Sequence, residues 1–242
     1  MPGSVERALD SALDKALAIQ RPVVVAYLDR VRTKYPTASP ADVIAQLERR
    51  YLTAVVSTGA ASGGAAALPG VGTTASIATG AAEIAAFVGA TAMFVLAVAE
   101  VHGVPINDPQ VRRALVLTVL LGDVAEPTVE AVAGGSAHWA HVLGRSDREA
   151  IGGLNSRLAH LMVGRFGARQ SALLLGRAIP FGIGAGIGAA GNAALARAAI
   201  GTARRAFGSP PRRFRGRVIE ASSRDSALRK VYRRVRQSRK AL

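Results

Sequence analysis

The most conspicuous candidate for acid–base chemistry in this chain of 242 residues is an acid with apolar surroundings. Glu83 is the only charged residue within residues 51–99. An acid in so apolar a stretch must pair with a base, bind a proton or face water. We expect an ion pair with Arg177 or Arg197, and ion or proton handling by Glu83 is the alternative.

Glu100 and His102 follow at the end of the same stretch. They could cap a helix or form a small polar cluster, and with Glu83 they could provide the acid and base of a hydrolase or transferase. However, the sequence lacks the Ser-His-Asp order and the glycine-flanked serine of a nucleophile elbow. We therefore predict that the protein is not an enzyme.

Two imidazoles, His138 and His141, are three residues apart and could share a metal ion from one helix face. A metal site needs a third and a fourth ligand. Glu130 is about two helical turns earlier, but nothing in the sequence directs it to the site. Surface or capping histidines are the expected outcome. The chain has no cysteine, which excludes disulfides and cysteine-zinc sites.

Gly186-Ile-Gly188-Ala-Ala-Gly191 matches the G-x-G-x-x-G pattern of dinucleotide-binding loops. Such a loop follows a strand and precedes an acid by about 20 residues, whereas the residues before this run are glycine and alanine and the next acid is Glu220. Glycines four apart favour close helix packing instead. We predict no cofactor and no small-molecule substrate.

The chain contains two Gly/Ala-rich blocks, residues 51–100 and 178–196, of which residues 51–82 and 178–196 carry no charge. Small side chains allow helices to approach closely, as in a glycine zipper. Pro69 and Gly70 break the first block, which predicts a helical hairpin of residues 52–67 and 73–101. The predicted packing and turn residues are Gly59, Gly63, Pro69, Gly70, Gly72, Gly80, Pro180, Gly184 and Gly188. The predicted buried polar residues are Glu83, Glu100, His102 and Asn192.

Residues 84–99 are strongly apolar but shorter than the roughly 20 residues that a membrane span needs. Extending the stretch backwards includes Glu83, which is costly at bilayer depth. Monotopic insertion, or burial in a helical core, fits better than two spans. The first residues carry acids where a signal peptide would be apolar, so we expect the body on the cytoplasmic side.

The remaining chain also predicts helices, since no run alternates as a strand would. Ser39, Asp108 and Ser146 are predicted to cap three of them. The helices are expected at residues 4–20, 22–35, 40–56, 109–122, 128–143, 146–166 and 185–207. The predicted fold is therefore an all-α multi-helix bundle over residues 1–208, with the two Gly/Ala-rich blocks buried at its centre.

The net charge of +15 is concentrated at the C-terminus, because residues 203–242 hold fourteen Arg and Lys against two acids. Pro210 and Pro211 suggest a linker, and residues 223–241 form a basic amphipathic pattern. We treat residues 209–242 as a second unit that binds a polyanion, with a helix docked on the body as the alternative. The predicted polyanion-binding residues are Arg212, Arg213, Arg215, Arg217, Arg229, Lys230, Arg233, Arg234, Arg236, Arg239 and Lys240.

One family shows these features together. The run Gly63-Gly64-Ala-Ala-Ala-Leu-Pro69-Gly70-Val-Gly72, then Glu83, then Ala99-Glu100-Val101-His102-Gly103, resembles the EcsC family of bacterial proteins. Ile179-Pro180-Phe-Gly-Ile-Gly184, with Asn192 and Ala206-Phe207, is similar to the second glycine-rich block of that family. The resemblance covers roughly residues 39–207. It implies a helical, membrane-associated protein without established catalysis and, because family members occur beside an ABC transporter operon, a membrane transporter as a partner.

Together these features predict a non-enzymatic accessory protein on the cytoplasmic side of the plasma membrane, peripheral or monotopic, with its basic tail on anionic lipid. The alternative is a soluble helical protein whose Arg-rich tail binds nucleic acid through phosphate neutralisation. Phe214 and Tyr232 are the aromatic residues available there for base stacking.

Overall fold

The computed structural model describes residues 11–214 except 12, 17, 20, 67–72, 137 and 177–182, and in residues 59–81, 83, 163 and 165–189 it describes the backbone alone. The described part consists of helices joined by turns and loops and contains no strand, which confirms the all-α prediction. Its helices are α2 (Arg21–Lys34), α3 (Pro40–Ala66), α4 (Thr73–His102), α5 (Pro109–Leu121), the 3₁₀ turn η1 (Gly122–Val124), α6 (Glu126–Ala133), α7 (Trp139–Leu143), α8 (Arg148–Gly176) and α9 (Ile183–Phe207).

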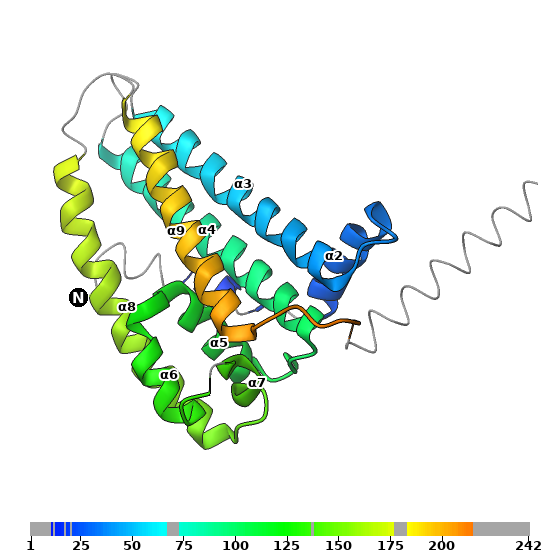
Figure 1. Cartoon of the computed structure of the whole chain (residues 1–242). Helices are drawn as coiled ribbons and strands as arrows, with labels where there is room; N and C mark the ends of the chain where they lie inside the picture. Colours follow the sequence, from blue (N-terminus) through cyan, green and yellow to red (C-terminus); the bar gives the residue numbers. More distant parts are fainter. Residues whose placement is uncertain are drawn as a thin grey trace, which may run out of the picture.

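Three long helices form the centre of the molecule (Figure 1). Helix α3 packs most extensively against α9 and next against α4. Helix α5 lies between α4 and α8, and α2 contacts α4 at the opposite side of the bundle from α8. In Figure 1 the C-terminal end of α3 and the N-terminal ends of α4 and α9 lie together at the upper left.

The core is built from the second half of α4 and from α5. Leu96 in α4 and Leu115, Leu117 and Leu121 in α5 are completely buried. Every residue of α5 from Ala114 to Leu121 is buried, because α4 covers one side of this helix and α8 the other. A helix that is apolar all round is typical of such a central position.

Helices α3 and α9, which each carry part of a Gly/Ala-rich block, pack against each other more extensively than any other described pair of helices. Ala193, Ala196, Ala199, Ala203 and Ala206 form a buried stripe along α9, and their small side chains let the helix backbones lie close. Asn192, which the sequence predicts to be buried, is half-buried, and its side-chain amide donates to the Val55 carbonyl oxygen of α3, at 3.2 Å.

The glycines of the predicted zipper are resolved only as backbone. Gly59 and Gly63 lie in α3, Gly80 in α4, and Gly184 and Gly188 in α9, while Pro69, Gly70, Gly72 and Pro180 lie outside the described residues. Gly191 is not a packing glycine, because a Cβ atom added there would meet nothing within 4 Å.

Two of the predicted helix boundaries are wrong. The helix expected to end near residue 56 is continuous with the first arm of the hairpin and extends as α3 to Ala66. Residues 128–143 form two helices, α6 and α7, instead of one. Gly134 and Gly135 separate them with φ of 62° and 74°, a left-handed conformation that ends a helix and that glycine adopts without a steric penalty.

The ends of the other helices follow local rules. Ser39 and Asp42 form the predicted capping box of α3, in which the Asp42 amide donates to Ser39 Oγ and the Ser39 amide donates to the Asp42 carboxylate. The Ser39 hydroxyl also donates to Asp42 Oδ2 at 2.7 Å, and this bond, followed by that from the Ser39 amide, lowers the pKa of the Asp42 carboxyl. Asp108 caps α5 through the Gln110 amide, as predicted. For α8 the predicted cap, Ser146, is wrong by one residue, since Asp147 accepts the hydrogen bond from the Ala150 amide, and α8 continues past residue 166 to Gly176.

Candidate functional site

A groove of about 500 Å³ lies between the first turns of α3 and the last turns of α4 and α9. Its walls are mainly apolar and include Ile44, Phe94, Val98 and Phe207. Its polar residues are Glu48, His102, His138 and Arg204. The segment that follows α9, with Gly208, Ser209 and Pro210, closes one side. This groove contains the described side chains best suited to binding or acid–base chemistry.

His102 reaches this groove from the last residue of α4, where it is only 4% exposed. Its ring lies 5.4 Å from that of Phe207 and 6.0 Å from that of His141, in an edge-on arrangement with the latter. His102 lies at the groove because α4 ends directly after it. Gly103 has φ of 73°, and the Val104 amide donates to the Ala99 carbonyl oxygen at 2.9 Å, which together terminate the helix.

The two residues His138 and His141 do not share a helix face. His138 precedes α7 and is exposed, whereas His141 lies within α7 and is turned toward His102. Glu130 is exposed on α6. Within the described ranges no three His, Asp or Glu side chains gather closely enough to hold a metal ion.

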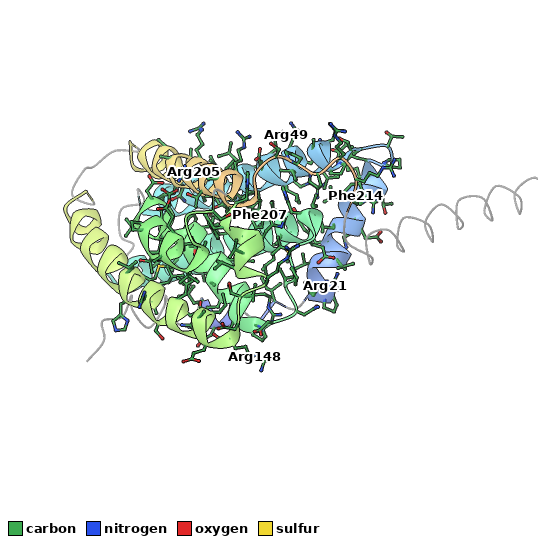
Figure 2. The ribbon with its side chains drawn as sticks, turned by 60° about the horizontal axis from the view of Figure 1, so that its bottom comes forward. Arg21, Arg49, Arg148, Arg205, Phe207 and Phe214 are labelled. Atoms are coloured by element: carbon green, nitrogen blue, oxygen red, sulfur yellow. The ribbon has the colours of Figure 1, made fainter. Side chains whose placement is uncertain are left out.

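An ion pair borders the groove. Arg204 Nε and Nη2 donate to the two carboxylate oxygens of Glu48, at 2.8 and 2.6 Å, and join α9 to α3. The hydrogen bonds to Glu48 raise the pKa of the Arg204 guanidinium. The next residue, Arg205 (Figure 2), lies about 100° further around the helix and donates to Asp123 and Glu126. None of these ion pairs is predicted from the sequence, since the partners are 156 and 79 to 82 residues apart along the chain.

Glu100 pairs with Arg21 and not with His102. Its side chain is 3% exposed and accepts two hydrogen bonds from Arg21 of α2, from Nη2 at 2.7 Å and from Nε at 2.9 Å. The hydrogen bond with Glu100 raises the pKa of the Arg21 guanidinium. The prediction that Glu100 and His102 are buried is confirmed, but they face different neighbours and do not form an acid–base pair.

The predicted partner of Glu83 stays a prediction. Its backbone lies in α4 and its side chain is outside the described part, as is Arg177, while Arg197 is exposed on α9.

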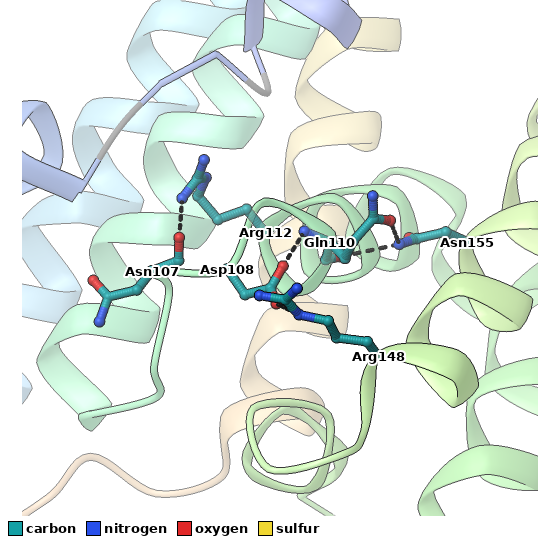
Figure 3. Close-up of polar contacts among 6 residues, drawn as sticks. All are labelled: Asn107, Asp108, Gln110, Arg112, Arg148 and Asn155. Carbon is teal, nitrogen blue, oxygen red and sulfur yellow. Dashed lines mark hydrogen bonds and ion pairs between the residues drawn. The ribbon is translucent and has the colours of Figure 1, made fainter.

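A second polar cluster, not foreseen from the sequence, joins α8 to the start of α5 (Figure 3). The buried side chain of Asn155 donates to the backbone oxygen and to the side-chain oxygen of Gln110, at 3.0 and 2.8 Å. Arg112 is also buried, and its Nη1 donates to the carbonyl oxygens of Ile106 and Asn107, both at 2.9 Å. The Arg112 bonds satisfy carbonyl groups of the α4–α5 loop and the Asn155 bonds join α8 to the first turn of α5, so we interpret the cluster as structural.

The basic tail is described only at its start. Arg212 and Arg213 are exposed. The predicted polyanion-binding residues Arg215, Arg217, Arg229, Lys230, Arg233, Arg234, Arg236, Arg239 and Lys240 lie outside the described residues. Phe214 packs beside α2, where the Arg32 guanidinium lies 4.2 Å from its ring centre (Figure 2). One of the two aromatics that could have stacked on nucleic-acid bases is therefore already engaged by the body.

The apolar half of α4 belongs to the protein core. Among the described helices, one stretch, Ile84–His102, is long and apolar enough to cross a membrane, and 67% of it is buried within the protein. Spanning by this stretch would require the core to come apart.

Tyr51 gives a pH-dependent prediction for that core. Thr91 Oγ1 donates to the Phe87 carbonyl oxygen, so the Tyr51 hydroxyl must donate to Thr91, at 2.8 Å. Burial raises the pKa of Tyr51 to about 12. Because the folded state holds this proton more tightly than the unfolded state, whose tyrosine pKa is about 10, stability should fall by on the order of 2–3 kcal/mol between roughly pH 10 and pH 12.

Urea unfolding at several alkaline pH values, with tyrosinate absorbance as a second signal, measures this loss. Tyr51→Phe should be less stable at pH 8 but should lack most of the alkaline decrease. An equal decrease in both proteins would contradict the assignment to Tyr51.

No protein-family model, curated protein or solved structure matches this chain.

Proposed function

We propose that the protein is a non-enzymatic accessory protein of membranes, held at the cytoplasmic face of the plasma membrane by monotopic insertion and by its basic tail. The observation that carries the proposal is the arrangement of the uncharged segments. Residues 51–66 of α3, 73–82 of α4 and 183–196 of α9 contain no charge, and the ends of these helices meet at one end of the bundle (Figure 1).

The depth of this uncharged end suits one leaflet. On α4 the uncharged end stops at Glu83, the first charged residue of that helix. The ten helical residues before Glu83 span about 15 Å. The hydrocarbon core of a bilayer is about 30 Å thick. Insertion to that depth leaves the apolar half of α4 in the protein core, in keeping with its burial.

Insertion alone would hold the protein weakly on the membrane, because glycine and alanine gain little free energy on transfer from water to hydrocarbon. Stable anchoring usually needs two signals. Residues 215–242 supply the second, with ten Arg and Lys against two acids, a net +8. Each base near an anionic leaflet adds about 1 kcal/mol. The resemblance to the EcsC family, and with it a transporter partner, stays a prediction.

Cosedimentation with vesicles tests both signals. We expect the protein to pellet with vesicles that contain phosphatidylglycerol and to be partly released by high salt, which screens the tail. Changing Arg229, Arg233, Arg234 and Arg236 to Gln should weaken pelleting and remove most of its salt dependence. Thr73→Asp, at the first residue of α4, should weaken pelleting about tenfold because it carries a charge toward the bilayer.

Thr73→Asp should not unfold the protein, because an acid at a helix N-terminus stabilises the helix. Val23→Asp places the same charge in the first turn of α2, at a residue 51% exposed, and should pellet like the parent. If the parent stays in the supernatant with anionic vesicles at low salt, the proposal is wrong. Salt-sensitive binding to a DNA duplex in that case would support the nucleic-acid alternative.

A further inference from the structure

We propose that the groove between α3, α4 and α9 binds a single-chain amphiphile with an anionic headgroup, of the fatty-carboxylate class. The groove lies at the end of these helices opposite to the uncharged end, so this inference is independent of the membrane proposal. Its volume of about 500 Å³ is within the range of roughly 300–1,000 Å³ found for small-molecule pockets.

The walls of the groove suit a hydrocarbon chain. Ile44, Phe94, Val98 and Phe207 supply apolar surface from all three helices. Small residues keep the space open, since Ala41 and Ala45 occupy the α3 side, where larger side chains would fill it. Apolar walls with a few converging polar groups are typical of small-molecule sites.

The polar groups favour a negative headgroup. The acid in the lining, Glu48, is already neutralised by Arg204. That pair uses Arg204 Nε and Nη2, so among the described residues the two Nη1 hydrogens make no hydrogen bond. His138 is exposed at the same rim and offers a further ring nitrogen. A carboxylate between these groups would gain charge-assisted hydrogen bonds, whereas a cationic headgroup would be repelled by Arg204.

Calorimetric titration of the full chain with laurate and with dodecanol, both below their micellar concentrations, tests the inference. The two probes share the alkyl chain and differ in the headgroup. We expect saturable binding of one laurate per chain, about tenfold tighter than dodecanol, as for one charge-assisted contact. Arg204→Gln should remove that preference.

Two matched variants test the location. Ala45→Leu extends into the groove from a half-buried position and should weaken laurate binding about tenfold or more. Ala54→Leu makes the same change on the same helix at an exposed position outside the groove and should bind as the parent does. Circular dichroism checks that both variants fold.

Three results would overturn the inference: no saturable binding of laurate, equal affinity for laurate and dodecanol, or unchanged binding by a folded Ala45→Leu variant. Vesicle pelleting of Ala45→Leu should match that of the parent, so failure of this proposal is distinguishable from failure of the membrane proposal.

Discussion

Arg21→Met should destabilise the protein by about 3–5 kcal/mol, because it leaves the Glu100 carboxylate buried without its cation. Glu100 is 3% exposed at its side chain, and both hydrogen bonds described for it come from Arg21. The loss is then the cost of an uncompensated buried charge, which greatly exceeds the net value of an ion pair at the surface.

A second substitution, at Glu100, distinguishes the cost of the unpaired buried charge from the loss of packing around α2. In Arg21→Met/Glu100→Gln the buried charge is absent, so most of the lost stability should return. Urea unfolding followed by circular dichroism measures all three proteins. If the double variant were as unstable as Arg21→Met, packing around α2 and not the buried charge would be the cause.

Arg148→Met is the matched control. Arg148 pairs with Asp108 at 3.3 Å but is 89% exposed and projects from the edge of the molecule (Figure 2). Solvent screens this pair, and its removal should cost less than about 1 kcal/mol. The contrast between the two arginines depends on burial, because both contact a carboxylate.

Gly208→Ala should also be strongly destabilising, by about 2 kcal/mol or more, for two additive reasons. Gly208 ends α9 with φ of 73°, and an L-residue in that conformation costs roughly 1–2 kcal/mol. A Cβ atom there would also clash with the His138 ring. Thermal and urea unfolding give the magnitude.

Two further variants separate the conformational cost at Gly208 from the cost of the clash with His138. Gly208→Ala/His138→Ala removes the clash and should recover part of the stability, leaving the conformational cost. Gly191→Ala lies within α9 at an exposed position with open space around the added carbon, and should stabilise the protein by about 0.5–1 kcal/mol. Equal effects at the two glycines would show that neither the backbone conformation nor the His138 contact matters.

Gly208 contributes both to the end of α9 and to the groove. It turns the chain out of α9 and, with His138, forms part of the groove rim. Loss of laurate binding in Gly208→Ala at a temperature where the variant is folded would be consistent with a rim position.

Several elements could be predicted from the sequence because their causes are local. The capping box at Ser39, the Asp108 cap and the helical hairpin of α3 and α4 depend on residues a few positions apart. The glycine pair at 134 and 135 also carries a local signal, which the uninterrupted helix predicted for residues 128–143 overlooked. Its positive φ values end α6 by the same rule that ends α4 at Gly103.

That the protein is helical and that its positive charge is concentrated at the C-terminus could be read from the sequence, since periodicity and charge are properties of the chain. The pairing of Glu100 with Arg21 and of Glu48 with Arg204, and the covering of the apolar half of α4 by its neighbours, depend on how the helices pack in three dimensions. These partners are 79 and 156 residues apart. Helical spacing specifies which face of a helix is apolar, but the packing of several helices determines which distant residue meets it.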